Sequence, residues 1–235
     1  MARMPRLAVA GWPHFVVQRV HEGHALVRDQ SDVDDLHAAL REAAREHQVT
    51  VHAYVVGDAE LYLLATPARD DGISKCMQAL GRRYVAGYNR RHARSGGLWA
   101  GRYRSTIIEP AQHLLDCTVF IETHAIRSGL VRGVEEDRRS SAGHHLGLRS
   151  DPLIQDHALF WALGNTPFER EAVWRRKFEW GLSDQDVRRL SEAVNAGWAL
   201  GGPEFLRTLA HLAGRRVEPR PRGRPARAPT VKPLA

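Results

Sequence analysis

Apolar and polar residues alternate in three stretches of the first 110 residues. These stretches are 13–20, 49–66 and 101–109. Successive side chains of a strand point to opposite faces of a sheet, so this alternation predicts β-strands. The polar group Gly57-Asp58-Ala59-Glu60 interrupts the second stretch, and its Gly-Asp pair can form the tight turn of a hairpin. Glu60 and Tyr62 then lie two residues apart on one face of the second hairpin strand.

Three other segments carry apolar residues at helical spacing. They are 29–47, 72–93 and 110–129. Ser31 can cap the first helix, Pro110 suits the first turn of the third, and Gly129 can end it. Strands that alternate with helices in this way predict an α+β fold, an antiparallel sheet with helices packed on one face.

Beyond residue 150 the chain has helical patterns only, each punctuated by Gly or Pro. They predict a small helical module, which could include a helix-turn-helix. The last stretch is too rich in Pro and Arg to bury a core and predicts disorder. The expected organisation is a first domain over 1–150, the helical module over 151–213 and a disordered basic tail over 214–235.

The net charge of +7 is concentrated in two segments. The tail has seven basic residues and one glutamate, and 82–104 has seven arginines and no acidic residue. Such clusters are typical of proteins that bind the phosphate backbone of nucleic acids, although a solvated helix face and a solubilising tail would have the same composition. The predicted DNA-binding residues are Arg82, Arg83, Arg90, Arg91, Arg94, Arg102, Arg104, Arg222 and Arg224.

Aromatic residues and a short tail motif refine the expected partner. Tyr84, Tyr88 and Trp99 lie near the arginines and could stack on unpaired bases, but the two tyrosines fall on the apolar stripe of their helix and are more typical of core residues. The Pro-Arg-Gly-Arg-Pro sequence at 221–225 matches the core of an AT-hook, which binds the minor groove of A·T-rich DNA. The expected partner is single-stranded or hairpin DNA, with A·T minor-groove contact by the tail.

Cysteine and histidine usage argues against a metal or disulfide framework. Cys76 and Cys117 are far apart and form no CxxC pair. His113, His144 and His145 lack acidic or cysteine companions at metal-binding spacing, and we expect them to be solvated. No apolar run reaches membrane-spanning length, and the apolar stretch near the start is too short for a secretory signal. We therefore expect a cytoplasmic protein without a membrane partner.

Over nearly its whole length the chain resembles the HUH-type single-tyrosine transposases, in particular their REP-associated branch. The segments that carry the resemblance are 52–67, 77–105 and 120–131, with 214–225 matching the basic tail of that branch. The resemblance implies a ferredoxin-like HUH fold and an ancestry in DNA transposition. It also implies that a homodimer can form, because some members of the family are dimers.

In active members of this family, two histidines flanking one apolar residue hold Mg²⁺ or Mn²⁺ together with an amide side chain from a helix. A tyrosine of that helix attacks the phosphorus and becomes covalently linked to DNA. By the resemblance, Glu60 and Tyr62 here replace the histidines, Phe120 replaces the tyrosine and His124 replaces the amide, while Arg127 keeps the pattern. No catalytic residue, metal site or cofactor is therefore expected.

Three interpretations of these positions stay open. Glu60 and His124, with help from Asp58, could still hold a hard cation. Tyr62 could act as the nucleophile, although it occupies the strand position where the metal belongs. Alternatively, these residues fill a site that has no chemistry left.

The function that the sequence predicts is that of a transposase-like protein that binds single-stranded or hairpin DNA and does not cleave it. The alternatives are an active transposase or nickase with a rebuilt metal site, and a decayed remnant without function. A nicking assay on hairpin DNA separates the first two.

Overall fold

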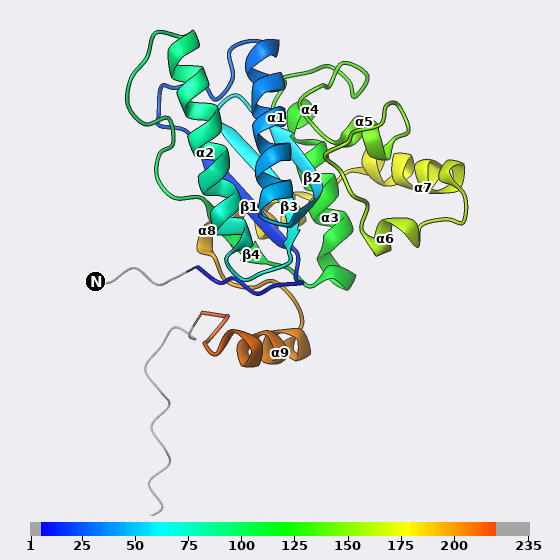
Figure 1. Cartoon of the computed structure of the whole chain (residues 1–235). Coiled ribbons are helices and arrows are strands. Elements are labelled where there is room, and N and C mark those ends of the chain that lie inside the picture. The colour runs from blue at the N-terminus through cyan, green and yellow to red at the C-terminus, as the bar shows by residue number, and fades with distance from the viewer. Residues whose placement is uncertain (1–5, 220–235) are drawn as a thin grey trace, which may run out of the picture.

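The computed structural model describes residues 6–219, and at its centre lies an open four-stranded antiparallel sheet (Figure 1). The strands are β1 (His14–Arg19), β2 (Val49–Val56), β3 (Glu60–Pro67) and β4 (Arg104–Ile107). Their order across the sheet is β2-β3-β1-β4, so β2 and β4 are the two edges. β2 and β3 form the predicted hairpin around the turn at 57–59.

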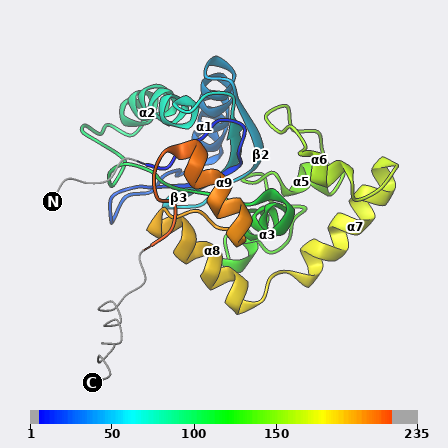
Figure 2. The same ribbon diagram turned by 90° about the horizontal axis from the view of Figure 1, so that it is seen from below.

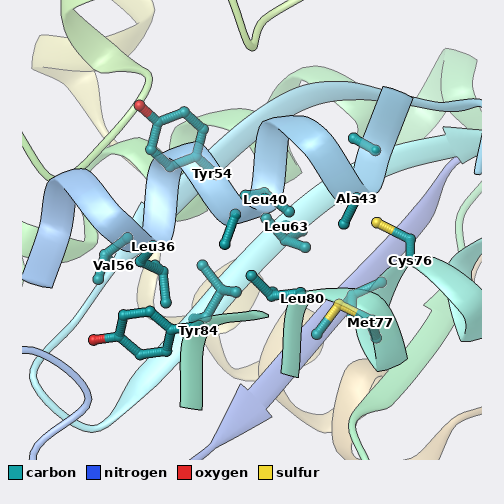
Figure 3. Packing of buried hydrophobic residues seen from close by; sticks show 14 of the residues in the cluster. Leu36, Leu40, Ala43, Tyr54, Val56, Leu63, Cys76, Met77, Leu80 and Tyr84 are labelled. Carbon is teal, nitrogen blue, oxygen red and sulfur yellow. The ribbon is translucent and has the colours of Figure 1, made fainter. Parts of the chain in front are cut away.

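Two long helices cover one face of the sheet: α1 (Gln30–Glu46) and α2 (Gly72–Arg91). Their apolar stripes meet the sheet around Leu36, Leu40, Leu63 and Leu80, as Figure 3 shows. Asp29, rather than Ser31, caps α1, because its side chain accepts a hydrogen bond from the backbone N–H of Asp32.

The α+β class is confirmed, but helices cover both faces of the sheet rather than one. The second face carries α3 (Pro110–Glu122), the single turn α4 (His124–Arg127) and α8 (Asp184–Ala196). Figure 2 places α3 and α8 on the side of the sheet opposite to α1 and α2. The strands allow this because their alternate positions are apolar too; Phe15, Val17 and Leu64 are almost fully buried beneath α3 and α8.

The remaining helices build two smaller cores against this framework. They are α5 (Ala142–His145), α6 (Ala158–Trp161), α7 (Pro167–Trp180) and α9 (Pro203–Ala213). The first three pack around Trp174 against α3, and α9 packs on Leu7, Val9 and Ile107. The helices beyond residue 150 thus share cores with the sheet domain. Between residues 6 and 219, no helix has the length and apolar character needed to cross a membrane.

The first residues of the expected tail are packed against the body. Gly214 ends α9 in the left-handed conformation, with φ of 59°. The chain then returns, and Val217 is 1% exposed, with its carbonyl accepting a hydrogen bond from the N–H of Ala199. Disorder was therefore the wrong expectation for 214–219, because the apolar Val217 follows the arginines closely. Arg222, Arg224 and the AT-hook motif lie outside the described residues.

Candidate functional site

The β2–β3 hairpin places Glu60 and Tyr62 on the face of the sheet that α3 and α4 cover. Glu60 lies opposite Arg19 of β1, and Tyr62 lies opposite Val17. At the turn, a Cβ on Gly57 would lie 3.2 Å from Nε2 of His124, so the glycine lets α4 approach closely. The four positions matched by the resemblance, Glu60, Tyr62, Phe120 and His124, therefore converge; we call them, with Arg19, the Glu60 site.

Arg19 and His124 each approach one oxygen of the Glu60 carboxylate. Arg19 Nε donates to Oε2 at 3.0 Å, and His124 Nε2 lies 3.6 Å from Oε1. Arg19 also donates from Nη1 to Oδ1 of Asn195 in α8, at 2.9 Å. The sequence did not reveal Arg19 or Asn195, because only strand register and the packing of α8 bring them here. The guanidinium of Arg19 thus lies where the resemblance places a metal ion.

Three rings fill the space beneath this ionic layer. Tyr62 lies 5.7 Å from Phe120 and 5.9 Å from Phe15, measured between ring centroids. Arg127 stacks over the Phe120 ring at 4.6 Å and donates to the Phe120 carbonyl at 2.7 Å. The ring at position 120 is therefore held as a core residue, and it offers no oxygen for attack on phosphorus.

The protonation states at this site disfavour nucleophilic chemistry. Burial, followed by the nearby Glu60 carboxylate, raises the pKa of Tyr62 to about 12. The phenolate needed for attack is therefore harder to form than in a free tyrosine. Burial lowers the pKa of His124, although Glu60 opposes that shift.

The residues present do not fit a divalent cation. Asp58, the third suggested ligand, pairs instead with Arg139 at 2.5 Å. That leaves Glu60 and His124, and the guanidinium of Arg19 already neutralises Glu60. Over residues 6–219, the one group of three close metal-ligating side chains is Asp29, Asp32 and His92, far from this hairpin in sequence. Asp32 in that group already accepts from Arg91 Nη1 at 2.5 Å and His92 Nε2 at 2.8 Å.

The arginine block of α2 divides into two sets on different sides of the helix. Arg83 pairs with Glu42 and Glu46, and Arg91 pairs with Asp32 and Asp35. These four acidic residues belong to α1, so Arg83 and Arg91 join the two helices. Their positions differ by eight residues, which returns nearly to the same side of a helix.

A second set of arginines faces solvent. Arg82, Arg90 and Arg102 are exposed, and none of them forms an ion pair within the described part of the chain. Arg94 donates to Asn89 at 3.5 Å and lies over the Tyr88 ring at 5.6 Å. Arg104 is held by the backbone carbonyl of Asn195 at 2.8 Å. Of the predicted arginines, therefore, Arg82, Arg90 and Arg102 are the ones most available to a ligand.

An open cavity of about 800 Å³ lies between α2 and the loop at 97–103. Val85, Leu98 and Trp99 line it with apolar surface, and Arg82 and Arg102 line it with positive charge. No aspartate or glutamate contributes to its walls within the described residues. We call this cavity the α2 groove. It combines an apolar surface with cations, as a site for unpaired bases and their phosphates requires.

The aromatic residues near the arginines have separate roles. Tyr84 and Tyr88 are almost fully buried, and their hydroxyls donate to the carbonyls of Leu26 and Ala25. The core role favoured for them by the apolar stripe is confirmed. Trp99 is half-buried and lines the α2 groove, where its ring is available for contact.

Of the three histidines expected to be solvated, His113 and His145 are buried, whereas His144 is partly buried, with its Nε2 3.4 Å from Asp156. His145 donates from Nδ1 to Oε1 of Glu122 at 2.5 Å. Its other ring nitrogen, Nε2, lies 3.4 Å from Oδ1 of Asp156. Glu122, which is fully buried, also accepts from Ser141 and Trp174. His113 is 4% exposed and contacts Arg189. The expectation failed because the partners come from separate helices, which residue spacing does not reveal.

Comparisons with known proteins give structural matches only. No family model and no curated protein matches this sequence. One solved structure that is similar is a REP-associated tyrosine transposase bound to a REP hairpin. It is 14% identical, the match covers 67% of this chain and 99% of that one, and the TM-score is 0.54. Another is a transposase candidate from Deinococcus radiodurans, 21% identical over 48% of this chain and 92% of that one, with a TM-score of 0.35.

The first of these matches bears on the fold, because it spans almost the entire solved chain. At 14% identity it shows shared architecture rather than shared chemistry. In fold, this protein resembles a REP-associated tyrosine transposase.

Proposed function

We propose that this protein binds single-stranded or hairpin DNA through the α2 groove and does not cleave it. One observation carries the proposal: the residues of the Glu60 site satisfy one another, whereas Arg82 and Arg102 of the α2 groove are exposed and form no ion pair within the described residues. The first site has no group poised for chemistry. The second is an accessible surface suited to a polyanion.

The α2 groove favours unpaired nucleotides over a regular duplex. Stacking on Trp99 and contact with Val85 require an exposed base face, which a duplex hides within its stack. Arg82 and Arg102 can then neutralise the phosphates on either side of such a base. The hairpin-bound state of the structurally similar transposase supports nucleic acid as the ligand class.

The inactive interpretation rests on two independent losses. Cleavage needs a nucleophilic oxygen, and Phe120 supplies none. It also needs a metal ion to polarise the phosphate. At the positions of the metal ligands, Glu60 instead forms an ion pair with Arg19 and contacts His124. Restoring the nucleophile alone, or the metal ligands alone, should therefore not restore cleavage.

An adduct assay tests this proposal. The full chain is incubated with Mg²⁺ or Mn²⁺ and a labelled DNA hairpin carrying single-stranded flanks, and covalent products are resolved under denaturing conditions. We expect neither nicked DNA nor an adduct from the parent or from Phe120→Tyr. The combined variant Glu60→His, Tyr62→His, Phe120→Tyr, His124→Asn restores every replaced position and is the matched comparison.

A metal-dependent adduct formed by the parent would overturn the inactive interpretation. Loss of that adduct in Tyr62→Phe would then identify Tyr62 as the nucleophile of a rebuilt site. Absence of binding to any DNA at low salt would overturn the binding half of the proposal and favour a remnant without function.

A further inference from the structure

A second basic cavity adjoins the α2 groove at the edge of the sheet. It has a volume of about 300 Å³ and lies between β4, the end of α8 and the N-terminal segment. Arg6, Arg102 and Tyr103 line both cavities, so the two are neighbours at the edge strand. We call the second one the α8 cavity. None of its arginines except Arg102 and Arg104 was among the predicted DNA-binding residues.

The walls of the α8 cavity are strongly positive. Arg6, Arg102, Arg104 and Arg215 contribute to them, and within residues 6–219 no acidic side chain does. Arg102 and Arg104 are exposed and form no ion pair within these residues, so both would attract an anion placed in the cavity. The arrangement therefore favours a ligand with concentrated negative charge.

Two of these arginines are oriented by contacts within the protein. Arg6 donates from Nε to the Tyr103 carbonyl at 2.9 Å and stacks over the Tyr103 ring at 3.7 Å. Arg104 donates from Nη1 to the Asn195 carbonyl at 2.8 Å. A guanidinium has five N–H donors, so this bond orients Arg104 and leaves other donors of that group for a ligand. Fixed guanidinium groups of this kind suit phosphate oxygens.

A buried hydroxyl gives a further observation at this place. Ser105 also lines the α8 cavity, and its Oγ has no hydrogen-bond partner in the described part of the molecule. Buried polar atoms normally have partners, so an unpaired one is unfavourable. A ligand with acceptor oxygens would be the kind of group that could provide such a partner.

We propose that the α8 cavity binds a backbone phosphate of the same DNA strand whose bases occupy the α2 groove. This inference rests on the proposed function and extends it with a second contact point. Because Arg102 lines both cavities, one single strand that follows the surface past Arg102 can reach from the groove, around β4, into the α8 cavity. Asn195 lines that cavity and accepts from Arg19, so the strand there lies next to the Glu60 site.

The length of the DNA separates the two contact points experimentally. Fluorescence anisotropy with the full chain would follow binding of labelled oligothymidylates of increasing length at fixed salt. Short oligomers fill the α2 groove alone, and longer ones reach the α8 cavity as well. We expect affinity to rise with length until both cavities are filled and then to level off.

Arg104→Glu should remove only the increase in affinity that longer oligomers show over short ones. We expect it to weaken the longer oligomers by about tenfold or more and to leave the shortest within about twofold of the parent, with a smaller salt slope for the longer ones. Arg104→Lys keeps the charge and should retain most of the gain. Arg176→Glu, an exposed site on α7, is the control for overall charge, and thermal melting verifies that each variant is folded.

Two outcomes overturn the inference while the proposed function stands: equal weakening of short and long oligomers by Arg104→Glu, or no weakening of either. A parent that binds no oligomer of any length instead overturns the proposed function. Arg215→Gln provides a second test from the opposite wall of the cavity, and it should repeat the loss that is specific to length.

Discussion

Two groups of charged side chains, one on each side of the sheet, differ in whether they have partners within the protein. On the α3 side, Glu60 is paired with Arg19 and approached by His124, and Glu122 is buried against His145. On the α2 side, Arg82 and Arg102 stand at a groove without acidic residues among the described ones that line it. Glu60 and Glu122 are therefore paired within the protein. Arg82 and Arg102 instead present positive charge to solvent, without an ion pair among the described residues.

Catalysis and binding depend differently on individual residues. A catalytic site needs several groups in one geometry, so replacing two of them removes the reaction. A polyanion surface adds many contacts of similar strength, and it survives changes at individual positions. Under the proposed function, this protein lacks cleavage at the Glu60 site while its groove binds nucleic acid.

The largest effect should come from reversing charge at the groove. We expect Arg82→Glu combined with Arg102→Glu to weaken binding of single-stranded DNA by about 100-fold at moderate salt, because two phosphate contacts become repulsive. Anisotropy titrations at several salt concentrations measure this loss. The control is Arg176→Glu with Arg207→Glu, two exposed arginines on α7 and α9, which changes the net charge equally. Equal losses in both variants would mean that overall charge, not the groove, binds DNA.

The next effect concerns pH and the α3 side. Burial alone would lower the pKa of His145, but Glu122 and Asp156 outweigh it and raise the value to about 9, above the ordinary value of 6.5. Protonated His145 therefore stabilises the fold fully below pH 6.5, and this contribution is lost as pH rises through 9. We expect a loss on the order of 2–3 kcal/mol between these pH values.

Chemical denaturation at pH 6.5 and pH 9 measures this change. His145→Gln cannot titrate and should show a much smaller difference between the two pH values. DNA binding should change little over the same range, since no histidine among the described residues lines the α2 groove. A stability curve that is flat in the parent would contradict the charged pair of His145 and Glu122.

The sequence predicted the framework well because its patterns are local. Alternation located the strands, helical spacing located α1, α2 and α3, and the Gly57-Asp58 turn was placed correctly. The resemblance also identified Tyr62 and Phe120, whose rings do meet. What it missed depends on contacts between elements: that alternate strand positions are buried on both faces, and that Val217 returns to the core.

The arginine block illustrates the same limit at the candidate site. Sequence composition treats Arg82, Arg83, Arg90 and Arg91 alike, because each is a cation on one helix. Only the packing of α1 against α2 shows that Arg83 and Arg91 meet acids while their neighbours do not. Arg19 escaped notice for a related reason, since the register of β1 against β3 decides its contact with Glu60.

Adjacent arginines of α2 should therefore behave differently. We expect Arg91→Ala to lower the melting temperature by roughly 2–5 °C, because it removes a partner of buried Asp32, and to change DNA binding little. Arg90→Ala should leave the melting temperature unchanged and weaken DNA binding by about threefold. Thermal melts and anisotropy on the same samples measure both. Identical behaviour of the two variants would show that the division of the block is incorrect.

The smallest effect is expected at the Glu60 site itself. Glu60→Gln keeps the shape of the side chain and removes its charge, and the side chain of its partner Arg19 is 39% exposed. A partly solvated ion pair contributes less than about 1 kcal/mol, so chemical denaturation should detect little change. Binding of oligomers short enough to fill only the α2 groove should stay within about twofold of the parent. If these short oligomers bind several-fold more tightly to Glu60→Gln, DNA reaches this carboxylate, and the α3 side belongs to the binding surface after all.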